Sequence, residues 1–108
     1  MERRFIVCTD EATVEQENKI SMFFKNDTGT AFWHWFHAVW LITDPNMKWT
    51  PGALRDALRD IVPQCSLLVI EVKEALRWSA VMGLTGAQGL RDIWTKGGSL
   101  EWKMPDSH

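Results

Sequence analysis

Tyrosine is absent from this chain of 108 residues, and cysteine occurs only twice, at Cys8 and Cys65. Two cysteines so far apart in the sequence exclude the disulfide framework that holds small secreted domains together. No apolar run approaches the ~20 residues of a membrane span, and the N-terminus lacks the apolar segment of a signal peptide. These absences predict a cytoplasmic protein without a membrane partner.

An excess of charge of one sign is also missing, because 14 acidic and 12 basic residues leave a net charge of −2. Proteins that wrap nucleic acid carry a basic surface, so the composition does not support a nucleic-acid partner, although it leaves one open. The hydrophobic fraction of 45% is that of a globular protein. A chain of this length buries roughly two-thirds of its unfolded surface. We therefore expect a single domain over residues 1–108 with a core of its own.

Tryptophan, in contrast, is abundant, with seven residues in the chain. The densest aromatic stretch is residues 30–43, TAFWHWFHAVWLIT. This stretch is too aromatic and β-branched to favour a helix, and it is long for one straight strand. It predicts two consecutive short strands joined by a bulge or tight bend near residues 36–38.

Two further apolar runs lie at residues 5–8 and 67–72. Both are short and rich in branched or aromatic side chains, a pattern typical of strands that are buried on both faces. We predict that they are neighbouring central strands of one sheet.

Two segments carry the signals of helices. The first begins near Val14, where Thr13 and Gln16 form a capping-box pair, and ends at the turn chemistry of residues 26–29, with its polar run 15–19 facing water. The second covers residues 51–62, with a proline at its first position and another just after its end.

The C-terminal third is less regular. Residues 73–83 follow no clean period, and residues 86–94 are predicted to form a short helix, which glycine weakens. In the tail, Leu100, Trp102 and Met104 alternate as they would along a short edge strand.

The order strand, helix, two strands, helix, strand predicts a ferredoxin-like α+β sandwich, in which helices cover one face of an antiparallel sheet. The other face of the sheet then needs a cover. The sheet of a second copy would provide one and make a homodimer. Segment 73–104 of the same chain is the alternative, and the sequence leaves both open.

Four pieces of sequence follow one another in this chain. They are a first strand that ends in aspartate, a Trp-rich strand pair, a helix with Leu-Arg-Asp and a strand with Leu-Leu-Val-Ile. These pieces lie at residues 5–10, 32–42, 54–56 and 67–72 and, with Trp78-Ser79, span most of residues 4–95. Their order resembles the SinR-family proteins, which are small bacterial proteins of unknown function. That group is similar to the ferredoxin-like subunit of the CRISPR spacer-integration complex and to VapD-type endoribonucleases.

The resemblance implies a small dimeric binding or regulatory protein linked to mobile elements or phage defence, without a cofactor. Its alternative is a divalent-metal-dependent endoribonuclease, in which Asp10 at the end of the first strand would be the catalytic metal ligand for Mg²⁺. Thr9 stands where these families usually have tyrosine. Read from the residues alone, an aspartate at this place more often serves as a turn or capping residue.

His34 and His37 are the candidates for a second metal site. In a straight strand they would point to opposite faces, whereas a bulge would bring both to one side, where Asp44 or Cys8 would complete a zinc site. No zinc-motif spacing supports this set, so packed or solvent-edge histidines are the favoured interpretation.

Strand alternation places Trp33, Trp35 and His37 on one face of the aromatic segment, and Phe32, His34 and Phe36 on the other. Interfaces are enriched in tryptophan and poor in lysine and glutamate. We therefore predict that Trp33, Trp35 and His37, with Trp102 from the tail, form a homodimer interface or a ligand face. A protein inhibitor or adaptor that uses this Trp-rich face to block a larger partner is a further alternative.

Overall fold

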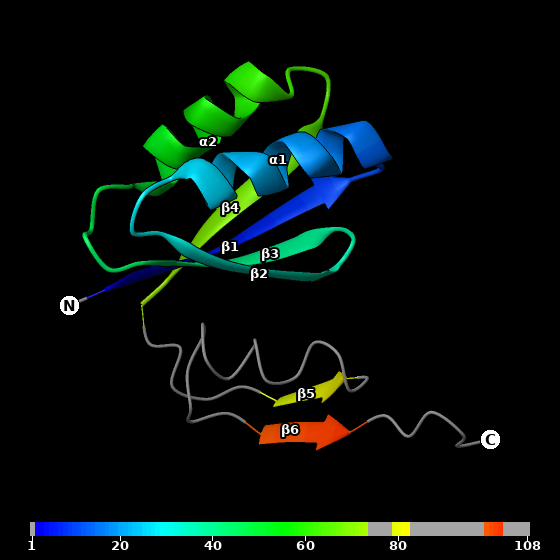
Figure 1. Ribbon diagram of the computed structural model, residues 1–108, viewed down its shortest axis with the longest axis vertical. Helices are drawn as coiled ribbons and strands as arrows, with labels where there is room; N and C mark the ends of the chain where they lie inside the picture. Colours follow the sequence, from blue (N-terminus) through cyan, green and yellow to red (C-terminus); the bar gives the residue numbers. More distant parts are fainter. Residues whose placement is uncertain (1, 74–78, 83–98, 103–108) are drawn as a thin grey trace.

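The structure is a computed structural model that describes residues 2–73, 79–82 and 99–102 (Figure 1). Its elements are β1 (Arg3–Asp10), α1 (Val14–Asn26), β2 (Ala31–Phe36), β3 (Val39–Asp44), α2 (Pro51–Ile61), β4 (Ser66–Val72), β5 (Ser79–Met82) and β6 (Ser99–Trp102).

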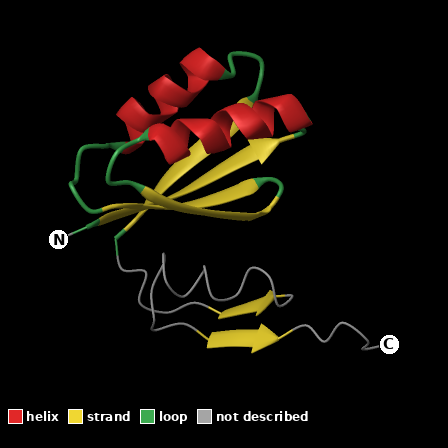
Figure 2. Ribbon diagram, viewed as in Figure 1, coloured by secondary structure: helices red, strands yellow, loops and turns green. Residues whose placement is uncertain are grey.

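The first four strands form one sheet in the order β2-β3-β1-β4, and every neighbouring pair is antiparallel. Both helices lie on the same face of this sheet (Figure 2). This is the arrangement of a ferredoxin-like sandwich, so the predicted α+β fold class is confirmed.

The helices begin where their capping residues predict. Thr13 Oγ1 accepts a hydrogen bond from the backbone N–H of Gln16, and the Gln16 side chain accepts one from the backbone N–H of Thr13. Thr50 Oγ1 accepts from the backbone N–H of Ala53 at the start of α2. Each side chain thus satisfies a donor that the first helical turn leaves free.

The core lies between the helices and the sheet. Phe5 and Val7 of β1 face the same side as their partners Ile42 and Trp40 of β3. Alternation along β1 directs these residues towards the helices, whereas Ile6 lies half-buried on the opposite face. The fully buried side chains that meet there are Phe5, Val7, Ile20, Phe24, Trp40, Ile42, Leu54 and Leu58.

Strand β4 is the edge of the sheet, so the prediction that residues 67–72 form a central strand is wrong. β1 does pair with β4, with Val7 opposite Val69, but the second inner strand is β3. The side chains of Leu68 and Ile70 remain 56% and 44% exposed. A continuous apolar run is therefore compatible with a strand that has one covered face and one open edge.

The aromatic segment forms two strands joined by a tight turn at residues 37–38, as predicted, and a separate bulge lies inside β2. Trp33 pairs with Leu41, but the next pair joins Phe36 to Val39, so β2 contains one extra residue between them. The bulge places Phe36 beside Trp33, with their ring centroids 5.0 Å apart. The prediction that Phe36 shares a face with Phe32 and His34 is wrong for this reason.

β5 and β6 form a separate parallel pair, which lies on the side of the main sheet opposite the helices (Figure 1). Part of segment 73–104 therefore lies on the face that needed a cover. The tail does contain a short strand, β6. The helix predicted at 86–94 and the side chains of Trp102 and Met104 lie outside the described residues.

Candidate functional site

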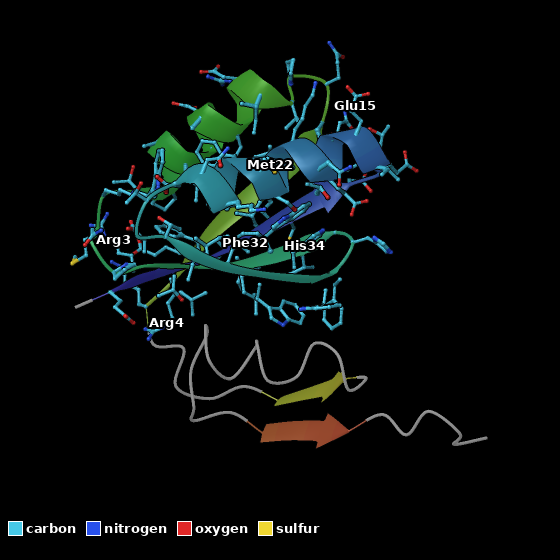
Figure 3. The ribbon with its side chains drawn as sticks, in the orientation of Figure 1. Arg3, Arg4, Glu15, Met22, Phe32 and His34 are labelled. Atoms are coloured by element: carbon cyan, nitrogen blue, oxygen red, sulfur yellow. The ribbon has the colours of Figure 1, made fainter. Side chains whose placement is uncertain are left out.

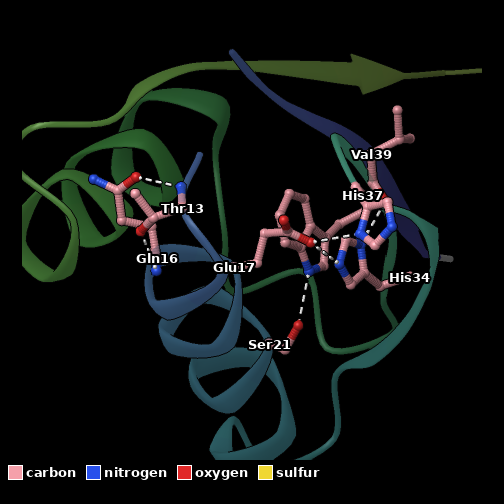
Figure 4. A network of polar contacts seen from close by, with 8 residues as sticks. Thr13, Gln16, Glu17, Ser21, His34, His37 and Val39 are labelled. Atoms are coloured by element: carbon pink, nitrogen blue, oxygen red, sulfur yellow. Dashed lines mark hydrogen bonds and ion pairs between the residues drawn. The ribbon is translucent and has the colours of Figure 1, made fainter. Parts of the chain in front are cut away.

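A carboxylate and two imidazoles meet beside the bulge of β2. Glu17 Oε1 lies 3.3 Å from His34 Nε2 and 3.2 Å from His37 Nδ1 (Figure 4). The three side chains come from α1, β2 and the turn between β2 and β3. The bulge thus brings both histidines to one acceptor, which is neither Asp44 nor Cys8.

The ring of His34 is held in a fixed orientation. Its Nδ1 lies 2.9 Å from the backbone oxygen of Val39. Because a carbonyl oxygen only accepts, Nδ1 carries the hydrogen. The ring stacks on Trp40, with centroids 3.9 Å apart and planes within 1°, and Trp40 in turn donates its indole N–H to Ser21.

The other ring nitrogen of His34, Nε2, faces Glu17. An imidazole that is protonated only at Nδ1 has a lone pair at Nε2, and a carboxylate oxygen is also an acceptor. In this tautomer the contact therefore brings two acceptors within 3.3 Å of each other.

Shelter from solvent differs sharply among the three groups. The side chains of Glu17 and His34 are 15% and 16% exposed, whereas that of His37 is 97% exposed. Figure 3 shows His34 on the helix side of β2, next to Phe32. The cluster thus consists of a sheltered pair and a third, exposed group that contacts it.

Two hollows flank the cluster. The larger, of about 300 Å³, is lined by all three groups and by the aromatic side chains of Trp35 and Phe36. The smaller, of about 150 Å³, is lined by Thr9 and Glu11 together with Glu17 and His37.

The smaller hollow has two unusual neighbours. Thr9 Oγ1 is buried without a hydrogen-bond partner. Glu11 has a φ of 53°, in the left-handed region that non-glycine residues rarely adopt. Unsatisfied polar atoms and strained backbone both concentrate at functional sites.

Asp10 lies at the exposed end of β1, opposite Ser66 of β4. Burial, and then the negative charge of Asp10, raise the pKa of the Cys65 thiol, so that this thiol stays protonated at neutral pH. The role of Asp10 as a catalytic metal ligand stays a prediction. Across the part of the chain that the structure describes, no group of three or more His, Cys, Asp or Glu side chains forms a ready-made metal site.

The predicted tryptophan face is divided between two environments. Trp33 is 3% exposed, whereas Trp35 is exposed and lines the larger hollow beside His34. The bulge separates these two neighbours because it interrupts the alternation that would have kept them together. The side chain of Trp102 lies outside the described residues.

The open edge of β4 is a second candidate site. Among the described strands, β1 is the one that pairs with β4, so the outer edge of β4 has no strand partner there. The single charged residue of β4, Glu71, lies 3.8 Å from Arg3 on the sheet itself. β4 thus lacks the lysine, proline and bulge that commonly protect edge strands, whereas β2 at the other edge has a bulge.

Sequence patterns did not identify either feature. Glu17 belongs to the polar run 15–19, for which the sequence predicts exposure to water. Its contacts with His34 and His37 become visible only when α1 is packed against β2. The β4 edge could be recognised only from the strand order. Leu68 and Ile70 are exposed, but leucine and isoleucine are also typical of buried strands, so the sequence does not distinguish the two cases.

No helix among the described residues has the length and apolar character needed to cross a bilayer.

Comparison with known proteins does not assign a family. No protein-family model matches the chain, and no curated protein matches it. Among solved structures, the chain is similar to a formyltetrahydrofolate deformylase from Pseudomonas putida KT2440, with 8% identity and a TM-score of 0.34. The match covers 97% of this chain and 43% of the deformylase chain, so this chain spans less than half the length of that protein.

Proposed function

We propose that the protein is a small homodimeric binding protein whose two copies pair along β4. The observation that carries the proposal is the open edge of β4 with its exposed side chains, Leu68 and Ile70. An unprotected edge strand presents a row of unpaired N–H and C=O groups, which is a template for another strand.

A second copy of the chain is the occupant that this edge fits. Two copies of one strand pair antiparallel about a two-fold axis, so the edge is complementary to itself. With the axis at Val69, Leu68 of one copy lies opposite Ile70 of the other on the same face of an eight-stranded sheet. Apolar cross-strand pairs of this kind stabilise antiparallel sheets.

The apolar surface on this edge is large enough to matter. Full burial of a leucine or isoleucine side chain contributes about 1.5–3 kcal/mol, and roughly half of each such side chain is available here. Four half-buried side chains, two from each copy, then contribute at most about 3–6 kcal/mol in addition to the new backbone hydrogen bonds, because they project from the face of the sheet and the added strand covers only their flanks.

The role of such a dimer is binding and regulation, in the cytoplasm. The link to mobile elements or phage defence rests on the resemblance to SinR-family proteins.

Sedimentation velocity of Ile70→Lys tests the proposal. The substitution removes two of the four apolar contacts and places two cations across the axis, so we expect the dimer to weaken by about 2–3 kcal/mol, or roughly 30- to 150-fold in Kd. Val14→Lys is the matched control, because Val14 is an exposed apolar residue on α1, away from the β4 edge. Equal sizes for the parent and Ile70→Lys would refute pairing along β4.

The same proposal expects no turnover of nucleic acid. Incubation of the protein with RNA and Mg²⁺ or Mn²⁺ should give no cleavage above a blank. Metal-dependent cleavage that disappears in Asp10→Asn would instead establish the endoribonuclease alternative.

A further inference from the structure

The cluster of Glu17, His34 and His37 has the chemistry of a transition-metal site. Two imidazole nitrogens and one carboxylate suit Zn²⁺, whereas Mg²⁺ prefers ligand sets made of oxygen. We propose that the chain binds one Zn²⁺ through His34 Nε2, His37 Nδ1 and the carboxylate of Glu17. The site does not depend on pairing along β4.

The spacing of the donors supports this assignment. Adjacent ligands of a tetrahedral zinc ion with bonds of 2.0–2.1 Å lie about 3.3 Å apart. Glu17 Oε1 lies 3.3 Å and 3.2 Å from the two imidazole nitrogens. A small rotation of the three side chains about these positions admits an ion between them.

The hydrogen bond on the far side of His34 is the second line of support. Histidines that bind metals almost always donate their other ring N–H to a carboxylate, a backbone carbonyl or water. His34 does so through Nδ1 to the backbone oxygen of Val39. This contact fixes the tautomer and points the lone pair of Nε2 at Glu17.

Zn²⁺ suits this pair because both facing atoms are acceptors. The ion forms one bond to the lone pair of His34 Nε2 and one to the carboxylate of Glu17, with no change in oxidation state.

The described residues contain no group that already has the geometry of a metal site, so the three side chains must shift slightly to take up the ion. His34 and Glu17 are sheltered, whereas His37 is 97% exposed and has room to move. The adjoining hollow of about 300 Å³ leaves room for water as a fourth ligand. Glu11, which lines the neighbouring hollow, adds negative charge nearby.

Isothermal titration of ZnCl₂ into EDTA-treated, dialysed protein at pH 7 tests the proposal. We expect one Zn²⁺ per chain. The titration should saturate at this stoichiometry. Absence of saturable binding, or a stoichiometry far from one ion per chain, would overturn the proposal.

Substitutions then locate the ion. His37→Gln should reduce the affinity at least tenfold, since even the loss of an outer-shell partner costs about 10- to 100-fold. Because His37 is exposed, its replacement leaves the core intact, and Glu17→Gln provides a second variant with unchanged shape. His108→Gln and Glu15→Gln are the controls, and unchanged affinity in His37→Gln and Glu17→Gln, or a loss in His108→Gln, would refute the site.

Discussion

Asp27 ties the end of α1 to the loop before α2, and its replacement should destabilise the fold in a pH-dependent way. Its carboxylate accepts hydrogen bonds from Lys48 Nζ at 2.7 Å, from Thr30 Oγ1 at 2.6 Å and from the indole N–H of Trp49 at 2.8 Å. Burial by itself would raise the pKa of Asp27, but these hydrogen bonds and the charge of Lys48 outweigh it and hold the pKa below its ordinary value.

The size of the effect follows from these contacts. A hydrogen bond to a charged group contributes about 1.5–3 kcal/mol, and neutral ones contribute about 1 kcal/mol. The contacts share one carboxylate and Lys48 is partly exposed, so they do not add fully. We expect Asp27→Ala to lower the free energy of unfolding by about 2–3 kcal/mol at pH 7.

The sign of the pH dependence is set by the lowered pKa. A carboxyl group whose pKa is lower in the folded state stabilises the fold above its unfolded pKa, which is about 3.9 for aspartate. This stabilisation is lost as the pH falls through the lower, folded pKa. The difference between Asp27→Ala and the parent should therefore be constant from about pH 5 to 7 and shrink below about pH 4.

Urea unfolding followed by tryptophan fluorescence at pH 7, 5 and 3 measures this difference, and the exposed Asp60→Ala on α2 is the control. A loss below about 0.5 kcal/mol at pH 7, which is the range of ordinary surface substitutions, would refute the role assigned to Asp27. A difference that stays the same down to pH 3 would refute the explanation by linkage.

Three further substitutions test how the fold is held together, each by thermal or urea unfolding. Gly29→Ala should cost about 1–2 kcal/mol, because Gly29 has a φ of 86° and a Cβ there would lie 2.6 Å from the Asn46 amide nitrogen; an unchanged midpoint would contradict this. Leu58→Ala removes a fully buried side chain of α2 and should cost about 2–5 kcal/mol, and a loss under 1 kcal/mol would show that the core is placed wrongly. Thr13→Ala removes half of the capping box of α1 and should cost about 0.5–2 kcal/mol; equal stability would deny the cap a role.

The fold was accessible from the sequence because its signals are local. The capping pair Thr13 and Gln16 marked the start of α1, and Thr50 and Pro51 marked that of α2. The length and aromatic content of residues 30–43 indicated two strands with a bend near residues 36–38, which the turn at residues 37–38 confirms, whereas the bulge lies earlier, inside β2.

The candidate site was less accessible because it depends on register. The sequence showed two histidines three positions apart, but which face each takes is decided by one extra residue in β2. Glu17 reaches them only because α1 packs over β2, which no local pattern reports. The position of β4 at the edge was missed for a similar reason, since an apolar run does not say how many neighbours a strand has.

Amide hydrogen exchange of β4 at high and low protein concentration tests pairing along this edge most directly. If two copies pair there, the amides of residues 66–72 that point away from β1 exchange slowly in concentrated samples and at least about tenfold faster after dilution below the Kd, while those of β3 stay unchanged. Exchange from β4 that is fast and independent of concentration would contradict the account.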